Sequence, residues 1–503
     1  MSEYVFRSNT SIGNLDAETD NFLQNCFIET EAYKTFETFD ENVKRILVGR
    51  TGTGKTALLK YIKMHADLLE QQEIEAETTI FNYIKNNKFI NGLLEQGVDL
   101  KIFFKALWNH VILVKILTLL KEKQSFFDNL TKKHKEMAEY VETYGEAFFS
   151  DNALNIITER FQTDMEGKVG CGNSFNIVGK KVEDKGSEIQ VQTNEYVNKT
   201  LLSKQKKIID YLSSEFKWDK QKKLFITVDD LDKSWISDIK IKYKFIDSLL
   251  DSIRDFLKLS NLKTIISIRT DILEGVYKYS YRQEEKDFSL ILPIEWSKNE
   301  IKTLLNKRIS HLLKDKYRAL HTPVLEDVFN FKIKKQNAVD YILNRTMLRP
   351  RDAIDFVNKC FQAADGQALI NEDNVLKAEE FFFVSRKNAL RDEWKALYPA
   401  IDKYIDVVLK FIHKQTFKIS HIDKEKAKDE VISSNASSDR IVDKALGNDE
   451  NFMEELLSVL FEIGVIGIKL SSDNILYSTF NKRHLDVSDF SKEFFVHPLF
   501  WRK

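Results

Sequence analysis

The sequence predicts an α/β fold in which parallel strands alternate with helices. Short apolar runs predict three buried strands, over residues 45–48, 224–228 and 264–268. Between the second and third runs, apolar residues recur at helical spacing from Ile246 to Leu257. A strand, a helix and a strand in this order form a parallel pair joined by a right-handed crossover.

The first predicted strand runs into a glycine-rich loop. Residues 49–56 read Gly-Arg-Thr-Gly-Thr-Gly-Lys-Thr and fit the phosphate-binding pattern G-x-x-x-x-G-K-[ST]. Glycines let successive backbone N–H groups face a phosphate, and the helix that follows adds its positive N-terminal dipole. The residues expected to bind a nucleoside triphosphate are Gly49, Thr51, Gly52, Thr53, Gly54, Lys55, Thr56 and Ala57. Lys55 is expected to act in catalysis at the β- and γ-phosphates, and the Thr56 hydroxyl to help hold magnesium.

A pair of carboxylates follows the second predicted strand. Asp229 and Asp230 stand at its carboxyl end, where open α/β sheets bind ligands. We expect Asp229 to hold magnesium. We expect Asp230 to polarise the attacking water, because hydrolysis requires such a group beside the γ-phosphate. Asp232 is either an N-cap for the next element, which is favoured, or a third site residue.

An arginine stands at the tip of the third predicted strand. In additional-strand ATPases a polar residue at this place senses the γ-phosphate, and Arg269 is assigned that role or a contact with a neighbouring subunit. The alternative is that Arg269 caps the strand end and pairs with Asp271. One more strand is expected over residues 288–292.

The predicted ATPase core, residues 1–295, contains a mainly helical insertion at about 85–215. A core strand is expected near residues 78–83, and residues 167–192, which begin with a glycine-rich turn, are interpreted as a small hairpin. The longest apolar stretch, residues 106–120, is too short to span a bilayer and is expected to be a core helix.

Residues 296–390 are interpreted as a helical lid. A helix is expected to begin near Pro350, because proline is accepted in the first turn. Arg349 and Arg351 flank this proline, and either one is expected to reach back to the bound phosphates and couple the lid to the nucleotide state. The alternative is a helix start at which both arginines are solvated.

Residues 391–503 are interpreted as a winged-helix-like domain. A helix that ends at Gly464 is followed by a hairpin of residues 465–469 and 475–479. The helix before the hairpin is acidic, which favours a protein-interaction or autoinhibitory role over DNA binding. The aromatic tail is expected to dock on another surface, with His497 packed within it.

The bulk composition limits the classes of partner. The chain has 503 residues with a net charge of −1, so overall electrostatics do not favour nucleic acid. Three widely separated cysteines form no metal motif or disulfide framework. The amino terminus lacks the basic and apolar pattern of a signal peptide. We therefore expect a cytoplasmic protein without membrane contact.

These motifs together resemble a group of prokaryotic P-loop ATPases related to the STAND and KAP branches around AAA+ proteins and often found near phage-defence genes. The segments that carry the resemblance are residues 13–20, 48–58, 228–235, 268–271, 349–352 and 496–498. The resemblance implies an additional-strand sheet with ATP and Mg²⁺ as cofactors. It also implies phosphate and magnesium binding by Gly52, Gly54, Lys55 and Thr56, with Asp229 and Asp230 serving metal and hydrolysis.

Two functions remain open at this point. No Asn-Lys-x-Asp guanine reader and no Leu-Ser-Gly-Gly signature occurs, so adenine is expected by exclusion. The favoured function is an ATP-driven switch that forms a homo-oligomer and controls a protein effector in a defence or signalling complex. The alternative is a DNA-dependent ATPase of the loader or initiator type, which would bind duplex DNA through its lid and winged helix.

Overall fold

The computed structural model divides the chain into two compact units. The first comprises Met1–Phe36, Gly49–Tyr61 and Pro293–Lys503, and the second comprises Glu37–Val48 and Ile62–Leu292. The structure describes residues 5–37, 43–65, 69–76, 80–121, 159, 162–163, 185–214, 223–229, 231, 239–317, 322–433, 440–472 and 474–502. In this part of the chain, no helix combines the length and the apolar character needed to cross a membrane.

A five-stranded sheet has the order β2-β3-β4-β1-β5. Its strands are β1 (Ile46–Gly49), β2 (Leu69–Glu75), β3 (Lys223–Asp229), β4 (Leu262–Arg269) and β5 (Ile291–Pro293). β3 pairs in parallel with both β2 and β4. β4 lies between β1, which leads into the glycine-rich loop, and β3, which ends in Asp229. This arrangement confirms the predicted additional-strand P-loop fold.

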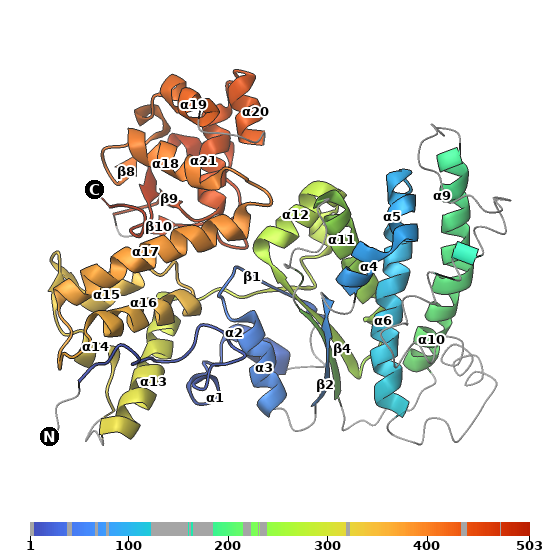
Figure 1. Ribbon diagram of the computed structural model, residues 1–503, viewed down its shortest axis with the longest axis horizontal. Helices are drawn as coiled ribbons and strands as arrows, with labels where there is room; N and C mark the ends of the chain where they lie inside the picture. Colours follow the sequence, from blue (N-terminus) through green and yellow to red (C-terminus); the bar gives the residue numbers. More distant parts are fainter. Residues whose placement is uncertain are drawn as a thin grey trace. The chain divides into compact units, whose positions relative to one another are not determined.

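The strands predicted from apolar runs are present because their side chains are buried on both faces. All four residues of β1 are buried, as are the first seven residues of β4. The crossover between β3 and β4 contains α11 (Ile239–Phe256), and α12 (Thr270–Ser280) follows β4, as Figure 1 shows. η3 (Glu284–Lys286) then leads to β5.

The prediction of a strand near residues 78–83 is wrong. The strand is β2, at Leu69–Glu75, and residues 82–86 form α4 (Asn82–Asn86). The sequence of β2, Leu-Glu-Gln-Gln-Glu-Ile-Glu, has only two apolar residues. β2 stands at the edge of the sheet. It is a strand because its backbone pairs with β3, and its sequence contains no buried apolar run that would predict it.

The insertion is mainly helical where the structure describes it. Its helices are α5 (Lys88–Glu95), α6 (Lys101–Lys121), α9 (Lys185–Tyr196), the π-helix η2 (Val197–Leu202) and α10 (Ser203–Ser214). Residues 185–192 lie in α9, so the predicted hairpin is wrong for them, and the rest of that segment, residues 167–184, lies outside the described residues. α6 packs against α11, and the buried Trp108 indole donates a hydrogen bond to the Phe245 carbonyl at 3.1 Å.

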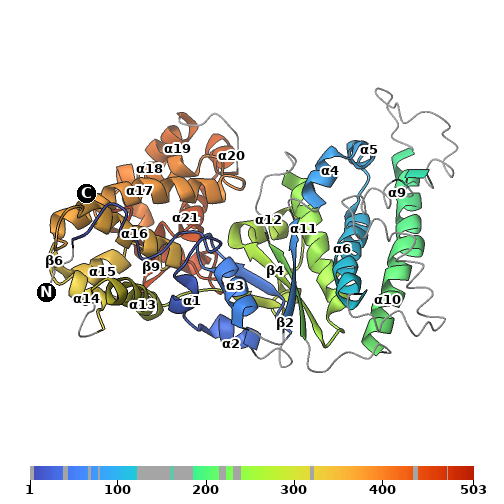
Figure 2. The same cartoon turned by 60° about the horizontal axis from the view of Figure 1, so that its bottom comes forward.

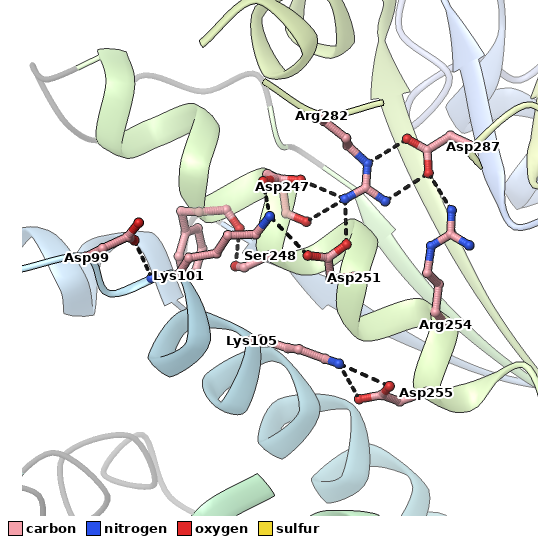
Figure 3. A network of polar contacts seen from close by, with 11 residues as sticks. Asp99, Lys101, Lys105, Asp247, Ser248, Asp251, Arg254, Asp255, Arg282 and Asp287 are labelled. Carbon is pink, nitrogen blue, oxygen red and sulfur yellow. Dashed lines mark hydrogen bonds and ion pairs between the residues drawn. The ribbon is translucent and has the colours of Figure 1, made fainter. Parts of the chain in front are cut away.

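Ion pairs fasten α6 and the end of α12 to α11, as Figure 3 shows. Lys101 of α6 contacts Asp247 at 2.6 Å. Arg282 contacts Asp247, Asp251 and Asp287, each at 2.6 Å. Burial alone would lower the pKa of Arg282, but Asp287 and Asp251 raise it above its ordinary value. The guanidinium therefore joins three segments of the second unit.

The helical lid belongs to the first unit. Its helices are α13 (Lys298–Tyr317), α14 (Leu325–Val328), α15 (Ala338–Leu343), α16 (Pro350–Ala363) and α17 (Glu372–Trp394), with a small ladder of β6 (Lys332–Ile333) and β7 (Gln336–Asn337). α16 and α17 lie side by side in Figures 1 and 2. The lead-in, with α1 (Leu23–Cys26) and α2 (Glu31–Glu37), is fastened to α13 by a buried ion pair between Asp20 and Arg308 at 2.6 Å.

The C-terminal module combines helices with a small sheet. Its helices are α18 (Ile401–Phe411), η4 (Ile419–His421), α19 (Lys424–Ser433), α20 (Arg440–Leu446), α21 (Phe452–Glu462) and η5 (Val487–Ser491). The sheet order β10-β9-β11-β8 joins β8 (Thr416–Phe417), β9 (Ile466–Lys469), β10 (Ile475–Leu476) and β11 (Phe494–Val496). The predicted hairpin is confirmed as β9 and β10. The aromatic tail docks as predicted, because β11 pairs with both β8 and β9.

Candidate nucleotide-binding site

The glycine-rich loop joins β1 to α3 (Lys55–His65). Gly52 has a φ of +81° and Gly54 a φ of +92°, a backbone region that side chains disfavour. A Cβ atom at Gly52 would also lie 2.8 Å from the Cβ of Arg351. The loop conformation therefore favours glycine at both positions; the motif specifies Gly54, whereas Gly52 stands at one of its variable positions.

Side chains brace the loop from within. The Thr53 hydroxyl donates to the Arg50 carbonyl at 2.9 Å. The Lys55 ammonium donates to the carbonyls of Gly49 at 2.8 Å and Arg50 at 3.2 Å, so it spans the concave side of the loop. Thr56 follows Lys55 in the first turn of α3, with Ala57 next to it. A helix start at this point directs its backbone N–H groups to the place where phosphates would bind.

Both predicted lid arginines lie against this loop. Arg349 is the N-cap residue of α16, is buried, and donates through its guanidinium to the Thr51 carbonyl at 3.3 Å. The backbone N–H of Arg351 donates to the Gly52 carbonyl at 3.3 Å, and its guanidinium donates to the Leu15 carbonyl at 3.0 Å. The alternative of a solvated helix start is wrong for Arg349. A contact of either arginine with phosphate stays a prediction.

Two residues beside the loop had no signal in the sequence. The Trp296 indole donates to the Thr53 carbonyl at 2.8 Å. Glu393, near the end of α17, accepts the Thr51 backbone N–H at 2.8 Å and contacts the guanidinium groups of Arg50 at 3.4 Å and Arg349 at 3.3 Å. Both residues lie hundreds of positions from the loop in the sequence, so no local pattern could reveal them.

Two arginines, Arg50 and Arg349, lie close together beside the loop, and Arg349 affects the pKa of Arg50. Burial, and after it the neighbouring Arg349, lower the pKa of Arg50 to about 10, while Glu393 and Asp352 act in the opposite direction. Arg50 remains charged at neutral pH. One carboxylate, Glu393, contacts the guanidinium groups of both Arg50 and Arg349.

The predicted carboxylates and Arg269 belong to the second unit. Asp229 is the last residue of β3, whereas Asp230 and Asp232 lie outside the described residues. Arg269 ends the neighbouring β4, and its Nε and a terminal nitrogen each donate to Asp271 at 2.9 Å. The alternative that Arg269 pairs with Asp271 is therefore observed, and its action as a γ-phosphate sensor stays a prediction.

The donor atoms present are suited to magnesium. Within the described ranges, no group of three or more His, Cys, Asp or Glu residues could hold a metal ion by itself. Mg²⁺ usually keeps several waters and is bound by one or two carboxylates together with substrate phosphates. The Thr56 hydroxyl and the Asp229 carboxylate are oxygen donors of the kind that such a site uses.

One region of the chain matches a known protein family. The family described as the FunZ-associated C-terminal helical domain matches residues 299–391, the region of α13 to α17. No curated protein matches the chain.

Several solved structures are similar over most of their length. The Aeropyrum pernix ORC1 protein in complex with DNA is 10% identical, with 94% of this chain and 93% of that chain covered and a TM-score of 0.33. A Walker-type ATPase of Pyrococcus abyssi is 10% identical, with 94% of each chain covered and a TM-score of 0.36. The Aeropyrum pernix ORC2 protein, in ADPNP and ADP complexes, is 11% identical, with coverages of 93% and 88% and a TM-score of 0.36. At these TM-scores the fold assignment rests on the sheet order and the loop described above.

Proposed function

We propose that this protein binds and hydrolyses ATP and acts as a molecular switch. The observation that carries the proposal is the braced glycine-rich loop between β1 and α3, in a sheet with one strand between β1 and β3. Backbone N–H groups of such a loop and a helix N-terminus bind phosphates in many nucleotide-binding proteins. Adenine is proposed by exclusion of a guanine-reading motif.

The residues of the site have separate roles in this proposal. Lys55 binds the β- and γ-phosphates and stabilises the charge that develops on them. Asp230 orients the attacking water and accepts its proton. Thr56 and Asp229 are the residues that would hold Mg²⁺, and the ion would supply positive charge to the phosphate oxygens. Arg269 would sense the γ-phosphate after exchanging its contact with Asp271.

The lid supplies the switch. The start of α16 contacts the loop twice, through Arg349 at Thr51 and through the Arg351 backbone at Gly52. A triphosphate in the loop would compete for the Arg349 guanidinium, so the position of the lid would depend on the nucleotide. Formation of a homo-oligomer and control of an effector protein in a defence or signalling complex are proposed from the resemblance stated above.

One observation favours a second function, a DNA-dependent ATPase of the loader or initiator type. The C-terminal module combines helices with the β9–β10 hairpin, the elements that a winged helix requires. The charge of α21 is against it, because Glu454 and Glu455 stand in its first turn and no basic residue stands in its last turn. Binding of duplex DNA would require a positive surface elsewhere.

Titration with a fluorescent ATP analogue tests nucleotide binding. Lys55→Ala removes a charged donor to the phosphates, so we expect affinity to fall by about 100-fold, which corresponds to about 3 kcal/mol. Lys63→Ala is the matched control, because Lys63 is an exposed lysine on the same helix. Tight binding by Lys55→Ala, or no binding by the natural chain, would refute the assignment of the loop.

A further inference from the structure

We propose that Glu393 is a positioning residue that fixes the first half of the phosphate-binding loop. The inference rests on the proposed function in one respect, namely that the loop binds ATP. Glu393 stands in the last turn of α17, and its carboxylate reaches the second and third residues of the loop, Arg50 and Thr51.

Both carboxylate oxygens of Glu393 are used. Oε1 accepts the Thr51 backbone N–H at 2.8 Å, so it fixes the main chain of the loop. Oε2 lies 3.4 Å from a terminal nitrogen of Arg50 and 3.3 Å from one of Arg349. The neighbouring Trp394 ring lies beside the Arg50 guanidinium, 5.8 Å from centroid to Cζ. The end of α17 therefore holds the loop through its main chain and through one of its side chains.

A carboxylate at position 393 is energetically unfavourable, which points to a specific role for Glu393. The Glu393 side chain is 2% exposed. A buried charge is costly, and a negative charge in the last turn of a helix also opposes the helix dipole. The guanidinium groups of Arg50 and Arg349 offset part of these costs. A packed apolar residue would stabilise this place with less penalty, so the carboxylate has a purpose beyond filling space.

The same cluster contains hydrogen-bond donors from which a bound anion could accept. Glu393 pairs with the guanidinium groups of both Arg50 and Arg349. Among the described residues, the Nε of Arg50 and one terminal nitrogen of Arg349 are buried without a hydrogen-bond partner. Buried donors without acceptors are rare in folded proteins. Their presence beside a glycine-rich loop fits a site where phosphate oxygens complete the set of acceptors.

The consequence is a loop that is shaped before nucleotide arrives. Without the negative charge of Glu393, the Thr51 N–H keeps at most a neutral and weaker acceptor, and the mutual repulsion of Arg50 and Arg349 is less offset. The loop would then have to be ordered at the moment of binding, which weakens affinity. Lys55 and Asp230, which are proposed to act on the reacting phosphate, would be unchanged. The loss should therefore fall on KM and Kd more than on kcat.

The test compares Glu393→Gln with Glu380→Gln, which changes an exposed glutamate on the same helix. Titration with the fluorescent ATP analogue should show Kd raised about tenfold for Glu393→Gln and unchanged for Glu380→Gln. Steady-state turnover should show KM raised by a similar factor, with kcat within about twofold of the natural chain. A Kd and KM equal to those of the natural chain, measured well below the melting temperature, would show a merely structural role and overturn the inference.

A second variant decides the matter if Glu393→Gln does not fold. Glu393→Asp keeps the charge for both arginines but withdraws the carboxylate by one methylene from the Thr51 N–H. We expect it to fold and still to raise Kd several-fold; a natural affinity would overturn the inference. Lys55→Ala, measured in parallel, separates the two proposals. If the natural chain binds ATP and Lys55→Ala does not, the proposed function stands whatever the Glu393 variants show.

Discussion

His497 illustrates how burial fixes a protonation state at the scale of one residue. Its Nδ1 accepts the Leu499 backbone N–H at 3.2 Å, and its ring packs against Tyr477 and Phe500. Burial, and after it the positive charges of nearby arginines, lower the pKa of His497 to about 3. The prediction that His497 is a packed residue is confirmed.

The lowered pKa of His497 makes stability depend on pH. In the unfolded chain the imidazole has a pKa of about 6.5, so between pH 6.5 and 3 the unfolded state binds more protons than the folded state. Stability should therefore fall as pH falls through this window, by up to about 1.4 kcal/mol per pH unit from this group. His497→Asn keeps an acceptor near the Leu499 N–H without titrating.

The measurement is the melting temperature of both chains from pH 7.5 to pH 4. The natural chain should lose more stability than His497→Asn over this range. Parallel curves for the two chains would show that His497 does not titrate as described.

At the residue scale, the sequence predicted local chemistry and missed distant partners. The glycines of the loop were predictable because their conformations follow from a contiguous motif. Glu393 was not, because its contact with Thr51 exists only after α17 has packed beside the loop. The pairing of Arg269 with Asp271 was foreseen as an alternative, since two residues of separation allow it in any strand end.

At the scale of elements, apolar runs predicted the strands that are buried on both faces and missed the polar one. β1, β3 and β4 are found within a few residues of their predicted bounds. β2 was misplaced because a polar edge strand is defined by the partner with which it pairs. In the C-terminal module, the two-residue β8 and the pairing of the tail as β11 also depend on contacts distant in sequence.

The attachment of helices in the second unit depends on Arg282. Asp287 and Asp247 are 0% and 1% exposed, so Arg282→Ala would leave two buried carboxylates without this guanidinium. We expect the free energy of unfolding to fall by about 3–5 kcal/mol, the range for breaking a buried ion pair. Chemical denaturation of the natural chain and of Arg282→Ala measures this difference in the free energy of unfolding.

Lys105→Ala is the control for this prediction. Lys105 pairs with Asp255 in the same network, but both side chains are partly exposed. We expect this change to cost less than about 1 kcal/mol. Equal effects of the two substitutions would contradict the central place given to Arg282.

At the scale of the whole molecule, the phosphate-binding loop shares its unit with the lid and the C-terminal module. The loop contacts α16 through Arg349 and α17 through Glu393. Glu295, which stands just before Trp296, accepts the backbone N–H of Phe480 in the C-terminal module at 2.6 Å. A nucleotide bound in the loop would therefore influence helices and strands far along the sequence, which is the coupling that the proposed switch needs.

The most direct test of the central claim is steady-state ATP turnover by the purified chain, with and without duplex DNA. Asp230→Asn serves as the blank, because it keeps the shape of the side chain but removes the proposed base. We expect slow turnover that Asp230→Asn abolishes and that duplex DNA leaves unchanged. Turnover retained by Asp230→Asn would contradict the site, and strong stimulation by DNA would contradict the switch in favour of a DNA-dependent ATPase.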